Sequence, residues 1–198
     1  KYSDAADSFK TVALLDDNRS LDTREKAADL ALDSLVLAKR EDLIESWALT
    51  FSKKFSRKSV EFAKISRKAI LNKAAVTLNA AEKGEDVSSS ELKRQLEKLN
   101  GMTLVGMSDQ EKTSYYKNKI ILAEKLKDLN EVETSANGLL KVSVLSAQDK
   151  EYALSRKAWA AEMKFDFKTA YKITKELKLS TLSASERALK LGTLAHMA

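Results

Sequence analysis

The chain has 198 residues, 43% of them hydrophobic, and its 35 Lys and Arg against 29 Asp and Glu give a formal net charge of +6. It contains no Cys and no Pro, which excludes disulfide frameworks, cysteine-ligated zinc sites, thiol enzymes and proline-rich linkers. The apolar content is high enough to bury a continuous core, so the sequence predicts a globular protein.

Proline breaks a helix interior and glycine weakens it, so a chain with no Pro and only five Gly can be helical over most of its length. Apolar residues recur at i, i+3, i+4 and i+7 in several long segments, with no long period-two stretch. These segments cover residues 23–38, 60–81, 112–129, 151–164 and 186–198. The pattern predicts an all-α protein of about ten helices.

The starts of these helices are marked by capping boxes, in which a Ser, Thr or Asp precedes an acidic residue by three positions. Five such pairs are Asp22/Glu25, Ser88/Glu91, Ser108/Glu111, Ser146/Asp149 and Ser183/Glu186. Gly84 and Gly101 suit the left-handed position after a helix end. We therefore expect short helices arranged in pairs.

Candidate core positions repeat when the caps Ser108, Ser146 and Ser183 are aligned with one another. Positions +8, +12 and +15 from each cap are all apolar: Tyr116, Ile120, Ala123, Leu154, Ala158, Ala161, Leu191, Ala195 and Ala198. A second helix has matching positions at +24, +28 and +31 from the cap: Val132, Ala136, Leu139, Ala170, Thr174 and Leu177. A looser copy begins at Asp22, with Leu30, Ser34 and Leu37.

Residues 151–179 carry a family resemblance. Leu154, Ala158, Ala161, Ala170 and Leu177 follow the tetratricopeptide-repeat pattern, and Phe165-Asp166-Phe167 stands where that family has a Gly-Asp-Tyr turn. Lys127-Asp128-Leu129 occupies the same place one unit earlier. The chain therefore resembles a tetratricopeptide-like array, best over residues 108–198.

The resemblance implies a right-handed solenoid of about ten antiparallel helices, built from helical hairpins in a single domain, residues 1–198. We expect first repeats over residues 1–55, an irregular repeat with one long helix over 56–107, and the best-matching repeats over 108–198. An uncapped solenoid leaves an apolar face bare, so we expect the parent protein to continue beyond at least one end.

No residue pattern predicts catalysis, a cofactor or a metal site. His196 is the sole histidine, and no Cys is present to complete a metal cluster or a Cys-His pair. Ser114 and Lys117 have a Ser-x-x-Lys spacing, but the companion motifs of that enzyme class are missing. No glycine-rich phosphate-binding loop occurs. We therefore predict a non-catalytic protein.

A second apolar stripe on the helix of residues 151–164 carries Tyr152, Trp159 and Met163, about 140° to 180° from the core seam. In tetratricopeptide-like arrays the corresponding positions line a concave groove. The groove residues implied here are Lys117, Ile121, Glu124, Tyr152, Ser155, Trp159, Glu162, Met163 and His196. The open alternative is that Trp159 packs against a neighbouring first helix.

Residues 53–73 hold eight cations against one acid, Glu61. On an ideal helix, four of the cations fall within about 100° of one another. The basic stripe proposed as a binding surface consists of Lys53, Arg57, Lys64, Arg67 and Lys68. It could meet an acidic protein or anionic lipid, while nucleic acid is disfavoured because stacking aromatics are not interleaved. The open alternative is a solvated face.

The predicted function is a non-catalytic scaffold or adaptor that binds a protein or peptide. One alternative is the helical, non-catalytic region of a larger bacterial cell-envelope enzyme or machine. A second alternative is a binder of anionic surfaces through the basic stripe. No apolar run approaches the roughly 18 residues of a membrane span. The composition favours the bacterial periplasm or envelope, although a cytoplasmic fragment would look the same.

Overall fold

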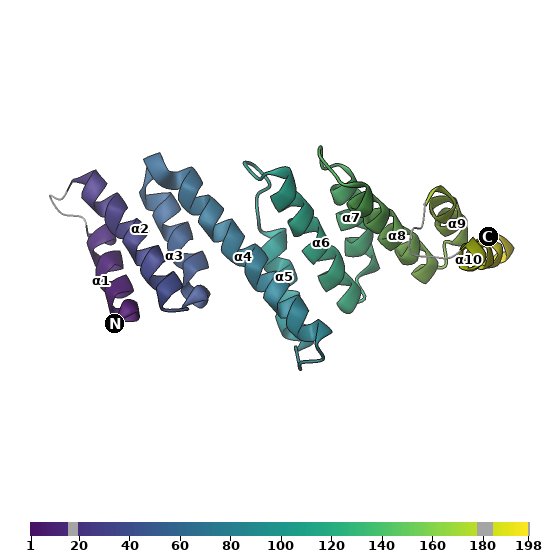
Figure 1. Cartoon of the computed structure of the whole chain (residues 1–198), viewed down its shortest axis with the longest axis horizontal. Helices are drawn as coiled ribbons and strands as arrows, with labels where there is room; N and C mark the ends of the chain where they lie inside the picture. Colours follow the sequence, from purple (N-terminus) through teal and green to yellow (C-terminus); the bar gives the residue numbers. More distant parts are fainter. Residues whose placement is uncertain (16–19, 178–183, 198) are drawn as a thin grey trace. The chain divides into compact units, whose positions relative to one another are not determined.

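The computed structural model describes residues 1–15, 20–177 and 184–197, and every regular element in those ranges is helical (Figure 1). The elements are α1 (Tyr2–Leu14), α2 (Leu21–Leu37), α3 (Glu41–Lys54), η1 (Ser56–Lys58), α4 (Ser59–Glu82), α5 (Ser89–Asn100), α6 (Asp109–Lys125), α7 (Leu129–Leu140), α8 (Ala147–Met163), α9 (Phe167–Glu176) and α10 (Ala184–Met197). The all-α prediction is confirmed. Among the described helices, none is both long and apolar enough to cross a bilayer.

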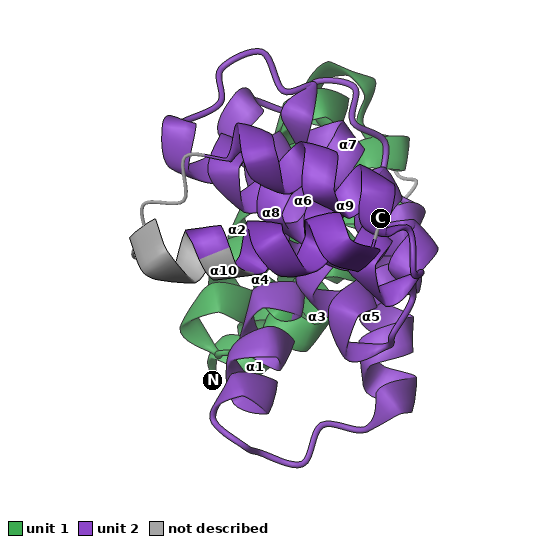
Figure 2. Cartoon of the chain, turned by 90° about the vertical axis from the view of Figure 1, so that its right-hand side faces the viewer, with its two compact units in different colours: residues 1–73 green, residues 74–198 purple. Residues whose placement is uncertain are grey.

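The chain divides into two compact units, residues 1–73 and 74–198 (Figure 2). In the first unit, α1 packs on α2 and α2 on α3. In the second unit, each helix from α5 to α10 packs on the next one along the chain. Helix α4 begins in the first unit and ends in the second. The subdivision expected at residues 1–55, 56–107 and 108–198 stays a prediction.

The helix starts follow the predicted caps with one exception. The hydroxyls of Ser88, Ser108 and Ser146 each accept the backbone N–H three positions later, and Ser108 forms a complete capping box. The cap at Asp22 is wrong, because α2 begins directly after Ser20, whose Oγ accepts the N–H of Thr23 at 3.2 Å. The cap predicted at Ser183 lies outside the described residues.

Helices α2, α6 and α8, here called first helices, share one length and one kind of end. Each has 17 residues. Lys39, Lys127 and Phe165 all stand at position +19 from the serine caps and have φ of 56°, 59° and 61°. The next N–H bonds to a carbonyl in the last turn of the helix, as Asp128 does to Ala123 at 2.9 Å. Left-handed residues therefore end all three first helices.

The core positions predicted for the second unit are largely confirmed. All six core positions predicted for the second helices, which are α7 and α9, are buried. On the first helices, the buried positions are Ile120, Ala123, Ala158 and Ala161. Tyr116, Leu154 and Leu191 are half-buried. Ala195 is a wrong assignment, since it is exposed and Leu194 is buried instead. Ala198 lies outside the described residues.

The register predicted for the first unit is wrong. Leu30 and Leu37 are 45% and 60% exposed. Counted from the actual cap, Ser20, positions +8, +12 and +15 are the buried Ala28, Leu32 and Leu35. Positions +28 and +31 are the buried Ala48 and Phe51. The spacing rule therefore holds in the first unit once the cap is placed correctly.

Candidate functional site

Three of the predicted groove residues, Lys117, Glu124 and Tyr152, belong to a charged contact between α6 and α8. We call it the α6–α8 face and define it by Lys117, Glu124, Asp149, Tyr152 and Arg156. Lys117 Nζ donates to Asp149 Oδ1 at 2.8 Å, and the Ser146 hydroxyl donates to Asp149 Oδ2 at 2.6 Å. These two donors, Lys117 first, lower the pKa of Asp149. The carboxylate therefore binds the serine that caps α8 and also ties this helix to α6.

Tyr152 lies between two cations. Its ring centroid is 5.4 Å from Lys117 Nζ and 5.2 Å from Arg156 Cζ, distances at which a cation is attracted to an aromatic ring. Its hydroxyl is buried and has no hydrogen-bond partner within the described part of the chain. Burial raises the pKa of Tyr152 to about 12, although Arg156 opposes the shift. The hydroxyl thus stays protonated at neutral pH.

An acid-base pair recurs at the far end of two first helices. Glu124 of α6 pairs with Arg156 of α8 at 3.4 Å, and Glu162 of α8 pairs with Lys190 of α10 at 2.9 Å. Both acids occupy position +16 from their serine caps. Burial raises the pKa of Glu124, although Arg156 opposes the shift. The glutamate at position +16 therefore joins α6 to α8 in one case and α8 to α10 in the other, each time through an ion pair.

The other groove candidates form none of the ion pairs of the α6–α8 face. Ile121, Ser155 and Trp159 are half-buried, and Met163 and His196 are exposed. Ser155 Oγ donates to the backbone carbonyl of Tyr152 at 2.7 Å. Trp159 packs against the core cluster that includes Ile120 and Ala160. Part of the Trp159 side chain remains at the surface.

Sequence reasoning missed the partner residues Arg156 and Lys190, and it treated Asp149 only as a cap. One pattern could have found two of the three. Lys117 and Asp149, and likewise Glu124 and Arg156, are opposite charges at the same separation along the chain. A constant separation of opposite charges between equal helices indicates pairs across neighbouring helices. Lys190 follows a different separation from Glu162, so this pattern does not reveal it.

The structure divides the basic stripe of the first unit. Arg57 binds both Asp22 and Glu25 of α2, with Nη2 at 3.0 Å from Glu25 Oε2, and these acids raise the pKa of Arg57. Arg67 is only 8% exposed, so it does not belong to an exposed stripe. The members that stay exposed outside these contacts are Lys53, Lys64 and Lys68. Binding of an acidic partner at the stripe stays a prediction for these three lysines.

Within the described ranges, no three His, Cys, Asp or Glu side chains are grouped so that they could hold a metal ion. No family model matches the chain, and neither a curated protein nor a solved structure shows significant similarity to it. The function is therefore inferred from the chain's own residues. The α6–α8 face offers paired charges and a half-buried aromatic ring.

Proposed function

We propose that this protein is a non-catalytic scaffold that binds a protein or peptide, with antiparallel helical pairs stacked as a right-handed, tetratricopeptide-like solenoid. The observation that carries the proposal is the equivalence of α2, α6 and α8. Each follows a serine cap, has 17 residues and ends in a left-handed residue at the same position after the cap. Equivalent units that bury their faces against neighbours are the basis of solenoids, which use extended surfaces for binding.

The binding surface that we propose is the α6–α8 face together with Met163 and His196. Ion pairs already order Lys117, Glu124 and Arg156, so a partner would not have to freeze these long side chains, and preordering favours affinity. Met163, the last residue of α8, is 52% exposed and offers an adaptable apolar contact. The two alternatives, a region of a larger cell-envelope enzyme and an anionic-surface binder, stay predictions.

Position-specific photocrosslinking tests the proposal. A benzophenone amino acid replaces Met163 in one variant and Val144, which is 78% exposed in the loop before α8, in the other. In extract of the source cells we expect a discrete cross-linked protein from position 163 and none from position 144. The substitution Arg156→Ala should reduce the yield, because it removes the pair with Glu124. Equal yields from both positions, or none from position 163, would contradict the proposal.

A further inference from the structure

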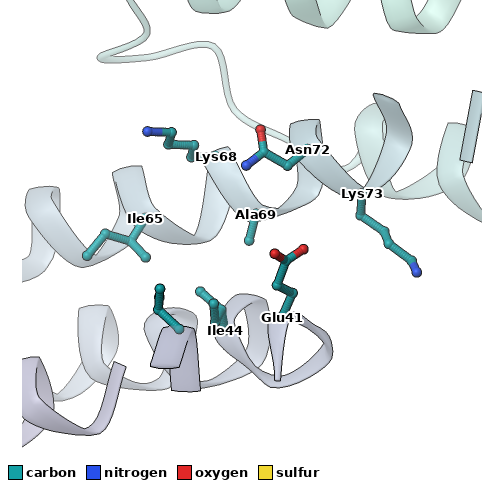
Figure 3. Close-up of a pocket in the computed structure, with 8 residues that line it drawn as sticks. Glu41, Ile44, Ile65, Lys68, Ala69, Asn72 and Lys73 are labelled. Carbon is teal, nitrogen blue, oxygen red and sulfur yellow. The ribbon is translucent and has the colours of Figure 1, made fainter. Parts of the chain in front are cut away.

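A cleft of about 310 Å³ opens in the first unit between the end of α2, the start of α3 and the middle of α4. Its walls include four aliphatic side chains, Val36, Ile44, Ile65 and Ala69. Figure 3 shows Ile65 and Ala69 of α4 facing Ile44 and Glu41 of α3. A volume of this size is within the usual range of ligand pockets.

The cleft wall includes a position of α2 at which the two other first helices, α6 and α8, carry a glutamate. Val36 occupies position +16 from Ser20, the position that Glu124 and Glu162 occupy after their own caps. In the second unit each of these glutamates neutralises a cation of α8 or α10. In the first unit the place is taken by a valine that is 60% exposed, and Lys68 of α4 lines the same cleft. Position +16 of α2 therefore carries no acid, and Glu41 of α3 is the acid among the residues that line the cleft.

Three polar groups of α4 beside the cleft form no hydrogen bond or ion pair among the described residues, although Arg40 and, to a smaller degree, Lys73 lower the pKa of Asp42. Lys68 and Lys73 form no ion pair there, and the Asn72 side-chain amide forms no hydrogen bond. Figure 3 shows the ammonium groups of Lys68 and Lys73 extending away from the aliphatic wall. In contrast, Arg57 and Lys58, just before α4, are both bound by carboxylates of α2. Two lysines and one glutamate, Glu41, therefore line this cleft and leave its wall with a net positive charge.

We propose that the cleft binds an extended acidic segment of a partner protein. An aliphatic side chain of the segment enters between Ile44 and Ile65, and flanking carboxylates pair with Lys68 and Lys73. The Asn72 side chain offers one amide oxygen and one NH₂ group, which match the N–H and carbonyl of an extended backbone. This site lies wholly in the first unit and is independent of the α6–α8 face.

A peptide titration of the full chain tests this proposal. The probe is a short capped peptide with one central leucine and two glutamates on each side, and its binding is followed by the amide NMR signals of the cleft residues. We expect binding to shift the signals of Ile44, Ile65 and Ala69, and to weaken as salt rises from about 50 to about 500 mM. Companion peptides with lysines for the glutamates, or glycine for the leucine, should bind at least about tenfold more weakly.

Matched variants separate the cleft from general electrostatics. Val36→Glu supplies a carboxylate to Lys68 and should weaken probe binding by about tenfold or more. Leu37→Glu makes the same charge change at a neighbouring residue that is equally exposed and lies outside the cleft wall, and should weaken it by less than about threefold. Circular dichroism of both variants checks that they are folded. Equal effects of the two variants, equal binding of the glycine peptide, or no shifts at the cleft would each overturn the proposal.

Discussion

At the scale of the residue, the ends of the first helices depend on a backbone conformation that their side chains disfavour. Lys39, Lys127 and Phe165 adopt the left-handed region, which costs an L-residue roughly 1–2 kcal/mol. The tetratricopeptide pattern has glycine at this place, and Gly84 fills it between α4 and α5 with φ of 80°. The chain therefore carries three strained turns that a glycine would relax.

Lys127→Gly is expected to stabilise the protein by about 0.5 kcal/mol, because the relief of left-handed strain exceeds the added entropy of the unfolded glycine, about 0.5–1 kcal/mol. Urea unfolding measures the change. Lys125→Gly, in the last turn of α6, is the matched control and should destabilise by about 1 kcal/mol, since glycine weakens a helix. If both variants lose stability equally, the turn at Lys127 is not strained.

The error at the start of α2 shows where reasoning from single residues fails. Asp22 and Glu25 have the spacing of a capping box, but Ser20 precedes them and caps the helix. The two acids instead bind Arg57, which follows the whole of α3 in the sequence. A local pattern cannot distinguish a carboxylate that caps a helix from one that pairs with a distant cation.

At the scale of the element, the buried faces of α7 and α9 were predictable from the sequence. The contacts between the first helices α6 and α8 were not. Val132, Ala136 and Leu139 follow a helical spacing that fixes the buried face. Helix α8 instead contributes to two core clusters: Ala153 and Ala160 belong to one and Ala161 to the other. A single apolar seam therefore describes α8 incompletely, and the ion pairs that complete its contacts leave no apolar pattern.

The pair of Lys117 and Asp149 makes the contact of α6 with α8 sensitive to acid. Asp149 has a folded-state pKa below its ordinary value of 3.8, so the pair stabilises the fold above that value. This contribution is lost as the pH falls through the lowered pKa. Asp149→Asn should therefore cost about 1 kcal/mol or less at pH 7 and nothing at the lowest pH, as measured by chemical unfolding.

Glu124 provides a control of opposite sign in the same contact. Its pKa in the folded protein is raised above 4.5, so its contribution to stability is fully present below that pH and is lost as the pH rises through the raised value. Relative to the unsubstituted protein, Glu124→Gln should therefore gain stability as the pH rises, whereas Asp149→Asn should lose it. Parallel pH dependences of the two variants would contradict this account of the α6–α8 face.

At the scale of the whole molecule, the sequence predicts that the fold is all-helical, but it does not predict where the chain divides into two units. Missing proline, sparse glycine and serine caps are local properties, and they suffice for an all-α chain. The division after Lys73 lies inside α4, where no glycine, proline or polar run marks it. The division depends on which helices pack together, and the composition of the sequence does not determine this packing.

Unfolding of the two units should be separable in the full chain if its helices are stabilised mainly by their neighbours. Phe51 is fully buried in the first unit, with its ring centroid 6.2 Å from that of Phe55 and 5.7 Å from that of Phe62. Phe51→Ala should cost about 3–5 kcal/mol through the cavity it leaves.

Native-state hydrogen exchange measures which of the two units loses stability in this variant. In the Phe51→Ala variant we expect faster exchange of the backbone amides of α2 and α3 and unchanged protection of α6, α7 and α8, because stability in a stacked array is a sum of local and nearest-neighbour contributions. Val132→Ala, buried in the second unit, should give the opposite pattern. If either substitution lowers protection equally in both units, the chain unfolds as one cooperative body, and the nearest-neighbour account of its stability is wrong.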